Sequence, residues 1–479
     1  MTSVKKSFFW STIEQLIPQT IRFILFVVLA RLLEPSDFGL VAMLALFMAI
    51  AGVFIDSGFS AALIQRKDIT ADDETSIFAF NIIAALAFAI LLCLISPLIA
   101  AFYQQKILIS LLCVNSLTLV IASFGMVHSK LLLRNMLFKK TALISTVSTA
   151  IAGMTGITMA FLGFGVWSLL GVGISENLVR TALYYKMSSW RPRGMVRFKN
   201  IQSMWGFSSR LLVCNLIGVT YQNTYAVIIG KVYSPESLGY FNRANRLRML
   251  PVNVLSGIVA SVAFPLFSKH QDDSQYLLAK MREIVRTTML ISAASMILLA
   301  VIADPLIPLL LTEKWRPAIP LLRILCFASV TFPIHALYLM ALQAQGLSHL
   351  NLRLESIKLV VGMGSIAVVY RYGVTALALN VVGMTVFAYF LNAWYNVKIL
   401  KYHWWLQAFD ILPAFILCCV SGYAAWWIGA NFLDDLLAIL AVQVITFLTL
   451  CFTGVFVFRK IYFDEVWGHF VWACDRIRL

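Results

Sequence analysis

The chain has 479 residues, of which 61% are hydrophobic and only 13% are charged. A soluble domain of ordinary composition carries about 25% charged residues, so this composition excludes that class and indicates an integral membrane protein. Its apolar runs are long enough to cross a bilayer, which takes about 20 residues. Because the runs are continuous and do not alternate, they favour transmembrane helices over a barrel.

Fourteen apolar runs between polar breaks predict fourteen transmembrane helices in an all-α protein. The first six occupy 13–33, 38–64, 77–103, 107–128, 139–162 and 164–186. A basic segment, "YKMSSWRPRGMVRFKN", follows at 185–200. The other eight runs occupy 206–231, 243–267, 284–311, 318–343, 353–371, 373–397, 405–430 and 433–458. The tail at 459–479 mixes aromatic and charged residues at helical spacing, which predicts an amphipathic helix on the inner membrane surface or docked on the bundle.

The distribution of basic residues sets the expected orientation. With the N-terminus inside, 25 of the 38 Lys and Arg fall in inner segments and six in outer links. This bias predicts that both termini are cytoplasmic. It also explains the net charge of +16 by topology, without a nucleic-acid partner. The Cys and His residues show no paired or ligand spacing, so we expect no metal and no cofactor.

Three short matches suggest an internal repeat. They pair "ARLLEPSDFG" (30–39) with "GKVYSPESLG" (230–239), "ISPLI" (95–99) with "ADPLI" (303–307), and "GFGVWSL" (163–169) with "RYGVTAL" (371–377). Kept in order and on the same membrane side, they predict two homologous six-helix bundles around a central cavity, an architecture suited to alternating access. We interpret the first pair as an outer hinge in which Pro and Gly make the turn.

These observations predict five parts of the chain. They are a six-helix half at 1–187, a basic cytoplasmic linker at 188–205, a second six-helix half at 206–400, two additional transmembrane helices at 401–458, and the tail at 459–479.

Several segments together resemble a known family. They are "VVLARLLEPSDFGLVAM" (27–43), "DSGFSAALIQRKD" (56–68), "GYFNRANRLRMLP" (239–251), "FPLFSKHQDD" (264–273) and "TEKWRPAIPLLRILC" (312–326). With them the chain resembles the polysaccharide-transporter family of the MATE-like MOP flippase superfamily, the Wzx-type exporters of O-antigen and colanic-acid repeat units. The resemblance implies a bacterial inner-membrane protein that flips undecaprenyl-diphosphate-linked oligosaccharides to the outer leaflet. The resemblance also implies that a polysaccharide polymerase and chain-length machinery are possible partner proteins.

Charged residues within spans are functional candidates, because each costs about 2.5–3.5 kcal/mol to insert. Arg22 lies near the middle of the first span, with Glu14 and Pro18 before it on one broad face. Its planar fork suits two-point contact with a diphosphate. The alternative is a pair with Glu14 or another internal carboxylate.

A second group of cations opens the eighth span. Arg243 and Arg246 share a helical face, and Arg248 points elsewhere. The matching part of the second span is apolar, so we interpret these arginines as a basic cavity wall for an anionic lipid-linked sugar. Snorkelling to the membrane interface is the alternative. Gln222 and Asn223 could bind sugar hydroxyls, or hydrogen-bond neighbouring helices.

The remaining candidates concern internal pairing or ion coupling. Asp56, placed deep in the second span, either pairs with a cavity arginine or titrates in ion coupling. Glu176 and Arg180 are four residues apart in the sixth span, which favours an internal ion pair. The sequence contains no GxxxxGK[ST] motif, so we expect an ion gradient or the supply of substrate to drive transport instead of ATP, and we favour a proton or sodium gradient.

Two rival functions stay open at this point. A membrane glycan polymerase or ligase would act on the same lipid-linked sugars, but such enzymes resemble one another in a large outer loop. The outer links here are short, the longest lying near 310–320. A MATE-like small-molecule exporter is the other alternative, which a shared superfamily cannot decide.

Overall fold

The structure is a computed structural model that describes residues 2–59, 63, 69–271, 273–345 and 347–458. Within these ranges every regular element is a helix, and no strand occurs. Eleven of the described helical segments are long and apolar enough to cross a membrane. The predicted all-helical membrane fold is therefore confirmed, whereas the count of fourteen spans stays a prediction. The tail at 459–479 lies outside the described residues.

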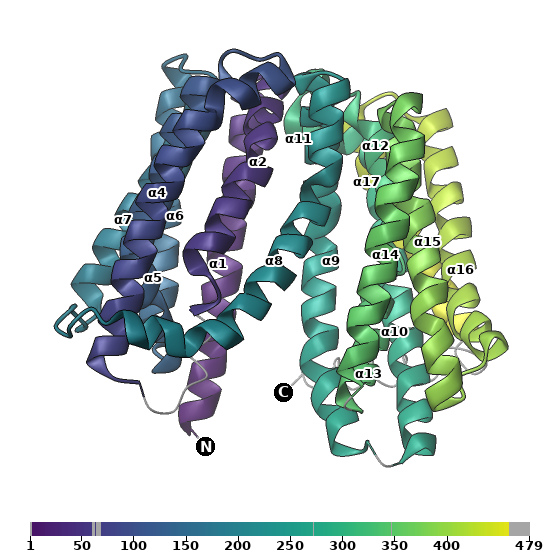
Figure 1. Ribbon diagram of the computed structural model, residues 1–479. Helices are drawn as coiled ribbons and strands as arrows, with labels where there is room; N and C mark the ends of the chain where they lie inside the picture. Colours follow the sequence, from purple (N-terminus) through teal and green to yellow (C-terminus); the bar gives the residue numbers. More distant parts are fainter. Residues whose placement is uncertain (1, 60–62, 64–68, 272, 346, 459–479) are drawn as a thin grey trace. The chain divides into compact units, whose positions relative to one another are not determined.

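The chain divides into two compact units, Met1–Gly239 and Tyr240–Leu479. The helices of unit 1 (Figure 1) are α1 (Thr2–Leu32), α2 (Pro35–Asp56), α4 (Ala71–Tyr103), α5 (Leu108–Arg134), α6 (Phe138–Phe161), α7 (Val166–Met187) and α8 (Phe198–Val232). Helix α1 packs on α6, α6 on α7, and α4 on α5, while α2 packs on α8. Most of these helices begin before the start of the predicted apolar run, because polar residues that flank the run also join the helix. Helices α5 and α7 begin just after the predicted start.

Unit 2 contains α9 (Pro235–Lys269, whose first turn belongs to unit 1), α10 (Ser274–Val301), α11 (Ala303–Leu311), η1 (Glu313–Trp315), α12 (Ala318–Ser329), α13 (Phe332–Ala344), α14 (Ser348–Val369), η2 (Tyr370–Tyr372), α15 (Val374–Leu400), α16 (Trp404–Phe432) and α17 (Leu436–Val457). Helix α16 packs on both α10 and α17, and α12 packs on α15. The two additional helices of the prediction, α16 and α17, thus pack within unit 2.

Two predicted helices of unit 2 are each broken in two. The run at 284–311 breaks after Val301, four residues before Pro305, and the run at 318–343 breaks after Ser329, four residues before Pro333. A proline ring clashes with the carbonyl four positions earlier and removes a backbone donor, so each helix ends at the residue whose carbonyl would be contacted.

A third break lies in unit 1 and changes the position of a candidate residue. The second span was predicted as one helix over 38–64, but α2 ends at Asp56. Ser57 and Gly58 follow with φ angles of 44° and 74°, in the left-handed region that terminates a helix. Asp56 is therefore the last residue of α2, and its predicted place deep within a span is wrong.

The two connectors of the repeat have the same local structure. Pro35 and Pro235 are the first residues of α2 and α9. Before them, Glu34 N–H donates to Asp37 Oδ2 at 3.1 Å, and Ser234 Oγ accepts from Ser237 N–H at 3.1 Å. Proline suits the first helical position, where its missing N–H has no partner to lose.

The glycines of the connectors do not form the turn that the sequence predicted, but allow two helices to approach closely. Gly39 lies inside α2 and Gly239 inside α9, and neither has a positive φ. A Cβ added to Gly39 would lie 2.9 Å from Pro235 Cα and closer still to its carbonyl group. A Cβ added to Gly239 would lie 2.9 Å from the carbonyl carbon of Pro35 and closer to its oxygen. Within unit 1 the two first turns thus pack backbone against backbone, each glycine on the other connector's proline.

Candidate functional site

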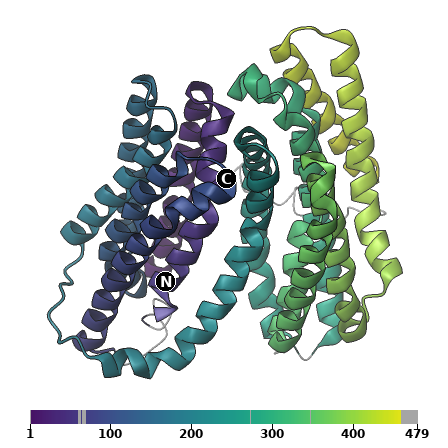
Figure 2. The same ribbon diagram turned by 45° about the horizontal axis from the view of Figure 1, so that its top comes forward.

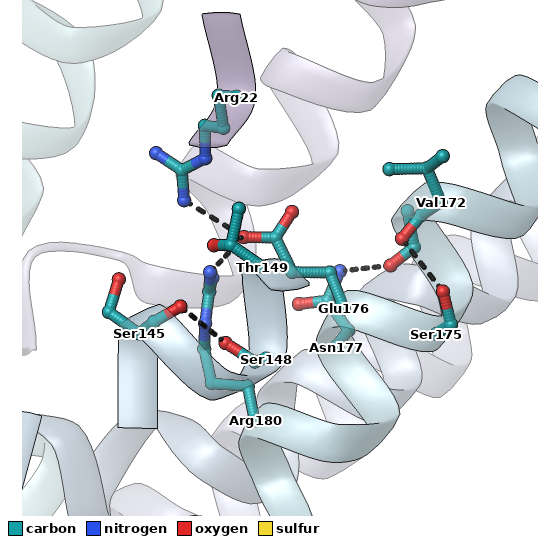
Figure 3. Close-up of polar contacts among 10 residues, drawn as sticks. Arg22, Ser145, Ser148, Thr149, Val172, Ser175, Glu176, Asn177 and Arg180 are labelled. Carbon is teal, nitrogen blue, oxygen red and sulfur yellow. Dashed lines mark hydrogen bonds and ion pairs between the residues drawn. The ribbon is translucent and has the colours of Figure 1, made fainter. Parts of the chain in front are cut away.

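Three helices of unit 1 bring charged and polar side chains together around one carboxylate. Arg22 of α1 contacts Glu176 of α7, with Nη2 and Oε1 2.8 Å apart. Arg180, one turn further along α7, binds the same Oε1. Thr149 of α6 donates to it as well, at 3.3 Å. Figure 3 shows the two guanidinium groups reaching this oxygen from above and below, and we call the four residues the Glu176 cluster.

Arg22 and Glu176 lie at matching distances from the ends of their helices. Arg22 is ten residues before Leu32, the end of α1, and Glu176 is ten residues after Val166, the start of α7. At 1.5 Å per residue, both are about 15 Å from that end of the helices. Neither helix is among the eleven described segments that are long and apolar enough to cross a membrane, so the predicted place of these charges within spans stays a prediction.

The cluster carries a surplus positive charge that is partly open to solvent. Two arginines share one carboxylate. The Arg22 side chain is 49% exposed, whereas that of Glu176 is 18% exposed. Among the described residues, Nε and Nη1 of Arg22 have no hydrogen-bond partner. The Glu14 side chain lies outside the described residues. Part of the Arg22 fork is therefore available to an anion.

The other polar candidates of unit 1 lie apart from this cluster. Gln222 is exposed on α8. Asn223 is half-buried, and its amide donates to Val219 O of the preceding turn at 2.7 Å. Within the described part of the chain, no hydrogen bond or ion pair joins either side chain to Arg22 or Glu176.

The three arginines of α9 have different surroundings within unit 2. Arg243 is only 4% exposed, and its guanidinium lies over the buried ring of Trp315 at 5.4 Å. Arg248 donates to Ser329 Oγ at 2.6 Å. Arg246 is exposed. Arg243 and Arg246, which are predicted to share a face, thus differ in exposure, and the Trp315 ring lies against Arg243.

Unit 2 contains a buried ion network that the sequence did not predict. The Asp410 side chain on α16 is fully buried and binds two arginines of α10, Arg282 through 2.8 and 3.0 Å contacts and Arg286 at 2.7 Å. Tyr402 O–H donates to Asp410 at 2.9 Å. The signal was a single carboxylate within the apolar stretch "WWLQAFDILPAF". Arg282 and Arg286 are among the 25 basic residues of the inner segments, and that count gives no sign of a carboxylate partner.

Comparison with known proteins gives the family. The family model described as polysaccharide biosynthesis protein matches residues 28–320, more than half of the chain. This chain belongs to the polysaccharide biosynthesis protein family. The resemblance inferred from the sequence is thereby confirmed.

Individual relatives agree with this assignment. The chain is 24% identical over 428 residues to the teichuronic acid biosynthesis protein TuaB of Bacillus subtilis (strain 168), covering 88% of each chain. It is 26% identical over 327 residues to the succinoglycan biosynthesis transport protein ExoT of Rhizobium meliloti (strain 1021), covering 68% of this chain and 66% of ExoT.

A solved structure shows the same fold. The lipid II flippase MurJ, in an inward closed conformation, matches with a TM-score of 0.77 and 15% identity, over 94% of this chain and 98% of MurJ. The chain therefore shares the fold of that protein, and a shared fold does not identify its substrate.

Proposed function

We propose that this protein is a flippase that moves undecaprenyl-diphosphate-linked oligosaccharide repeat units from the inner to the outer leaflet of the bacterial cytoplasmic membrane. The single observation that carries the proposal is the surplus positive charge of the Glu176 cluster, with Arg22 half-exposed. Such a charge is costly in lipid unless a cavity or an anionic ligand offsets it. A diphosphate offers the paired oxygens that a guanidinium fork binds.

In this proposal Arg22 contacts the diphosphate, while Glu176 and Arg180 position it. Because Glu176 binds Nη2 of Arg22, it fixes the side chain and leaves Nε and Nη1 for the substrate. Arg246, exposed on α9, is the corresponding candidate of unit 2. Arg243 and Arg248 also make internal contacts in unit 2, Arg243 with the Trp315 ring and Arg248 with the Ser329 hydroxyl. Gln222, Asn223 and Asp56 remain candidates for sugar contact and ion coupling.

Lipid analysis of depleted cells tests the proposal. Loss of the protein should leave lipid-linked repeat units in the cytoplasmic leaflet, where mass analysis would also identify the sugar. If the units instead reached the outer leaflet normally and stayed unpolymerised, the protein would act as the polymerase and not as the flippase. Loss of export after collapse of a proton or sodium gradient would identify the coupling ion.

A variant pair tests the role of Arg22. We expect Arg22→Gln to lose most export while inserting into the membrane normally, because Gln keeps a polar side chain but offers no charged fork. Arg31→Gln is the matched control, since Arg31 is an exposed cation at the end of the same helix. Equal export by the two variants would remove Arg22 from the substrate site.

A further inference from the structure

The ten residues between α7 and α8, here called the strap (188–197), are held firmly on unit 1. Three of its backbone N–H groups donate to side chains in the first turns of α4: Gly194 to Thr75 Oγ1 at 3.1 Å, Met195 to Asp72 Oδ1 at 2.9 Å and Arg197 to Ser76 Oγ at 2.9 Å. Figure 1 and Figure 2 show the first turns of α8 continuing across the ends of neighbouring unit 1 helices. Of the described residues of α8, Leu212–Val232 are long and apolar enough to cross a membrane.

Trp190 and Gly194 fix the strap in place. Trp190 Nε1 donates to Glu74 Oε2 at 2.6 Å, and its ring packs on Phe78 and His128 with centroids 5.5 and 4.9 Å apart. A Cβ added to Gly194 would lie 2.6 Å from the backbone nitrogen of Asp72, so only glycine allows this close approach. The predicted linker is therefore a docked segment at the start of a membrane span.

The outer side of the strap combines cations with exposed apolar side chains. Met195 is 70% exposed and Val196 is 60% exposed. Arg191, Arg193 and Arg197 are exposed around them. Within the described part of the chain, Arg193 has no hydrogen-bond or ion-pair partner.

The acidic residues beside the strap are bound by internal donors. Asp73 accepts from the backbone and hydroxyl of Thr70, and Glu74 accepts from Trp190. Asp72 accepts from the strap backbone and pairs with Arg197 at 3.1 Å. Among the described residues, none of these three carboxylates binds Arg193, so Arg193 is the cation that the strap offers to an anion.

We propose that the strap is a docking surface for anionic phospholipid headgroups of the cytoplasmic leaflet. It lies at the start of α4, at the end of unit 1 that the basic-residue bias assigns to the cytoplasm, where headgroups are the nearest anions. Basic residues near an anionic leaflet are attracted to it, and apolar neighbours enter the boundary between headgroups and acyl chains. A protein partner would also cover Met195 and Val196, but the strap adjoins the first turns of α4, a helix long and apolar enough to cross the membrane, where lipid is the nearest partner.

Photo-crosslinking with a readout local to the strap tests the proposal. The full-length protein is placed in phosphatidylcholine nanodiscs that contain a minor fraction of photoreactive-headgroup phosphatidylglycerol, and labelled peptides are mapped by mass spectrometry. We expect label on the peptide spanning the strap. Arg193→Gln should reduce it about fivefold, which corresponds to ~1 kcal/mol per basic residue. Lys106→Gln is the matched control, an exposed cation beyond the opposite end of α4.

Three results would overturn the proposal. The first is equal labelling of the strap in wild type and Arg193→Gln. The second is equal labelling when the photoreactive group is on phosphatidylcholine. The third is absence of label on the strap of the wild-type protein. Gly194→Ala keeps every charge but displaces the strap, so undiminished labelling in that variant would show that the docked geometry has no part in lipid binding.

Discussion

A methyl group at Gly39 should disrupt the contact between the two connectors. The added Cβ would lie 2.9 Å from Pro235 Cα and closer to its carbonyl group, whereas carbon atoms pack best at about 3.5–4.0 Å. The two first turns would have to separate by roughly an ångström, and forced overpacking of this kind costs about 1–3 kcal/mol. Gly239→Ala should cost a similar amount, because its Cβ meets Pro35 in the same way.

Thermal unfolding of the purified protein in detergent, followed by tryptophan fluorescence, measures the effect. Gly52→Ala on α2 and Gly257→Ala on α9 are matched controls, since nothing lies within 4 Å of a Cβ at either position. Alanine there should be neutral or stabilising, by up to about 1 kcal/mol. The double variant at Gly39 and Gly239 should lose less than the sum of the single losses, because the first methyl already separates the helices.

Two outcomes would refute this reasoning. If Gly39→Ala were as stable as Gly52→Ala, the close approach would not exist in solution. If the losses at Gly39 and Gly239 simply added, the two glycines would not share one contact.

Three further predictions follow from named contacts. Glu176→Gln should lower the melting temperature more than Gln222→Ala, because it leaves two arginines without their carboxylate; equal melting would show that the charges are solvated individually. Asp410→Asn should destabilise unit 2 by about 3 kcal/mol, because it leaves Arg282 and Arg286 near a neutral side chain, and an unchanged denaturation midpoint would contradict a buried network. Trp190→Phe should cost about 1 kcal/mol through the lost bond to Glu74 and speed proteolysis in the strap, whereas wild-type proteolysis would indicate that ring packing alone holds it.

Helix positions were largely predictable because the bilayer imposes them. Every chain segment in lipid must satisfy its own backbone, so apolar runs predict helices almost independently of tertiary contacts. The exceptions have local causes that the sequence also contained. Pro305, Pro333 and the Ser57–Gly58 pair broke runs that hydropathy alone joined. The error at Asp56 came from weighing apolarity above the left-handed turn that follows it.

The candidate site was only partly predictable, because partners came from distant segments. Spacing indicated the pair of Glu176 and Arg180, since both lie on one helix. It could not indicate that Arg22, more than 150 residues earlier, binds the same oxygen. The same limit hid the pairing of Asp410 with α10.

The amino-acid sequence by itself determined the membrane class, the helical fold and the family, because these depend on composition, local periodicity and short motifs. Only the tertiary structure decided which charges meet, that Trp315 covers Arg243 while Arg246 stays exposed, and that the repeated glycines serve a close approach instead of a turn. The physical reason is that packing between helices depends on shape and distance across the fold, and a one-dimensional pattern contains neither.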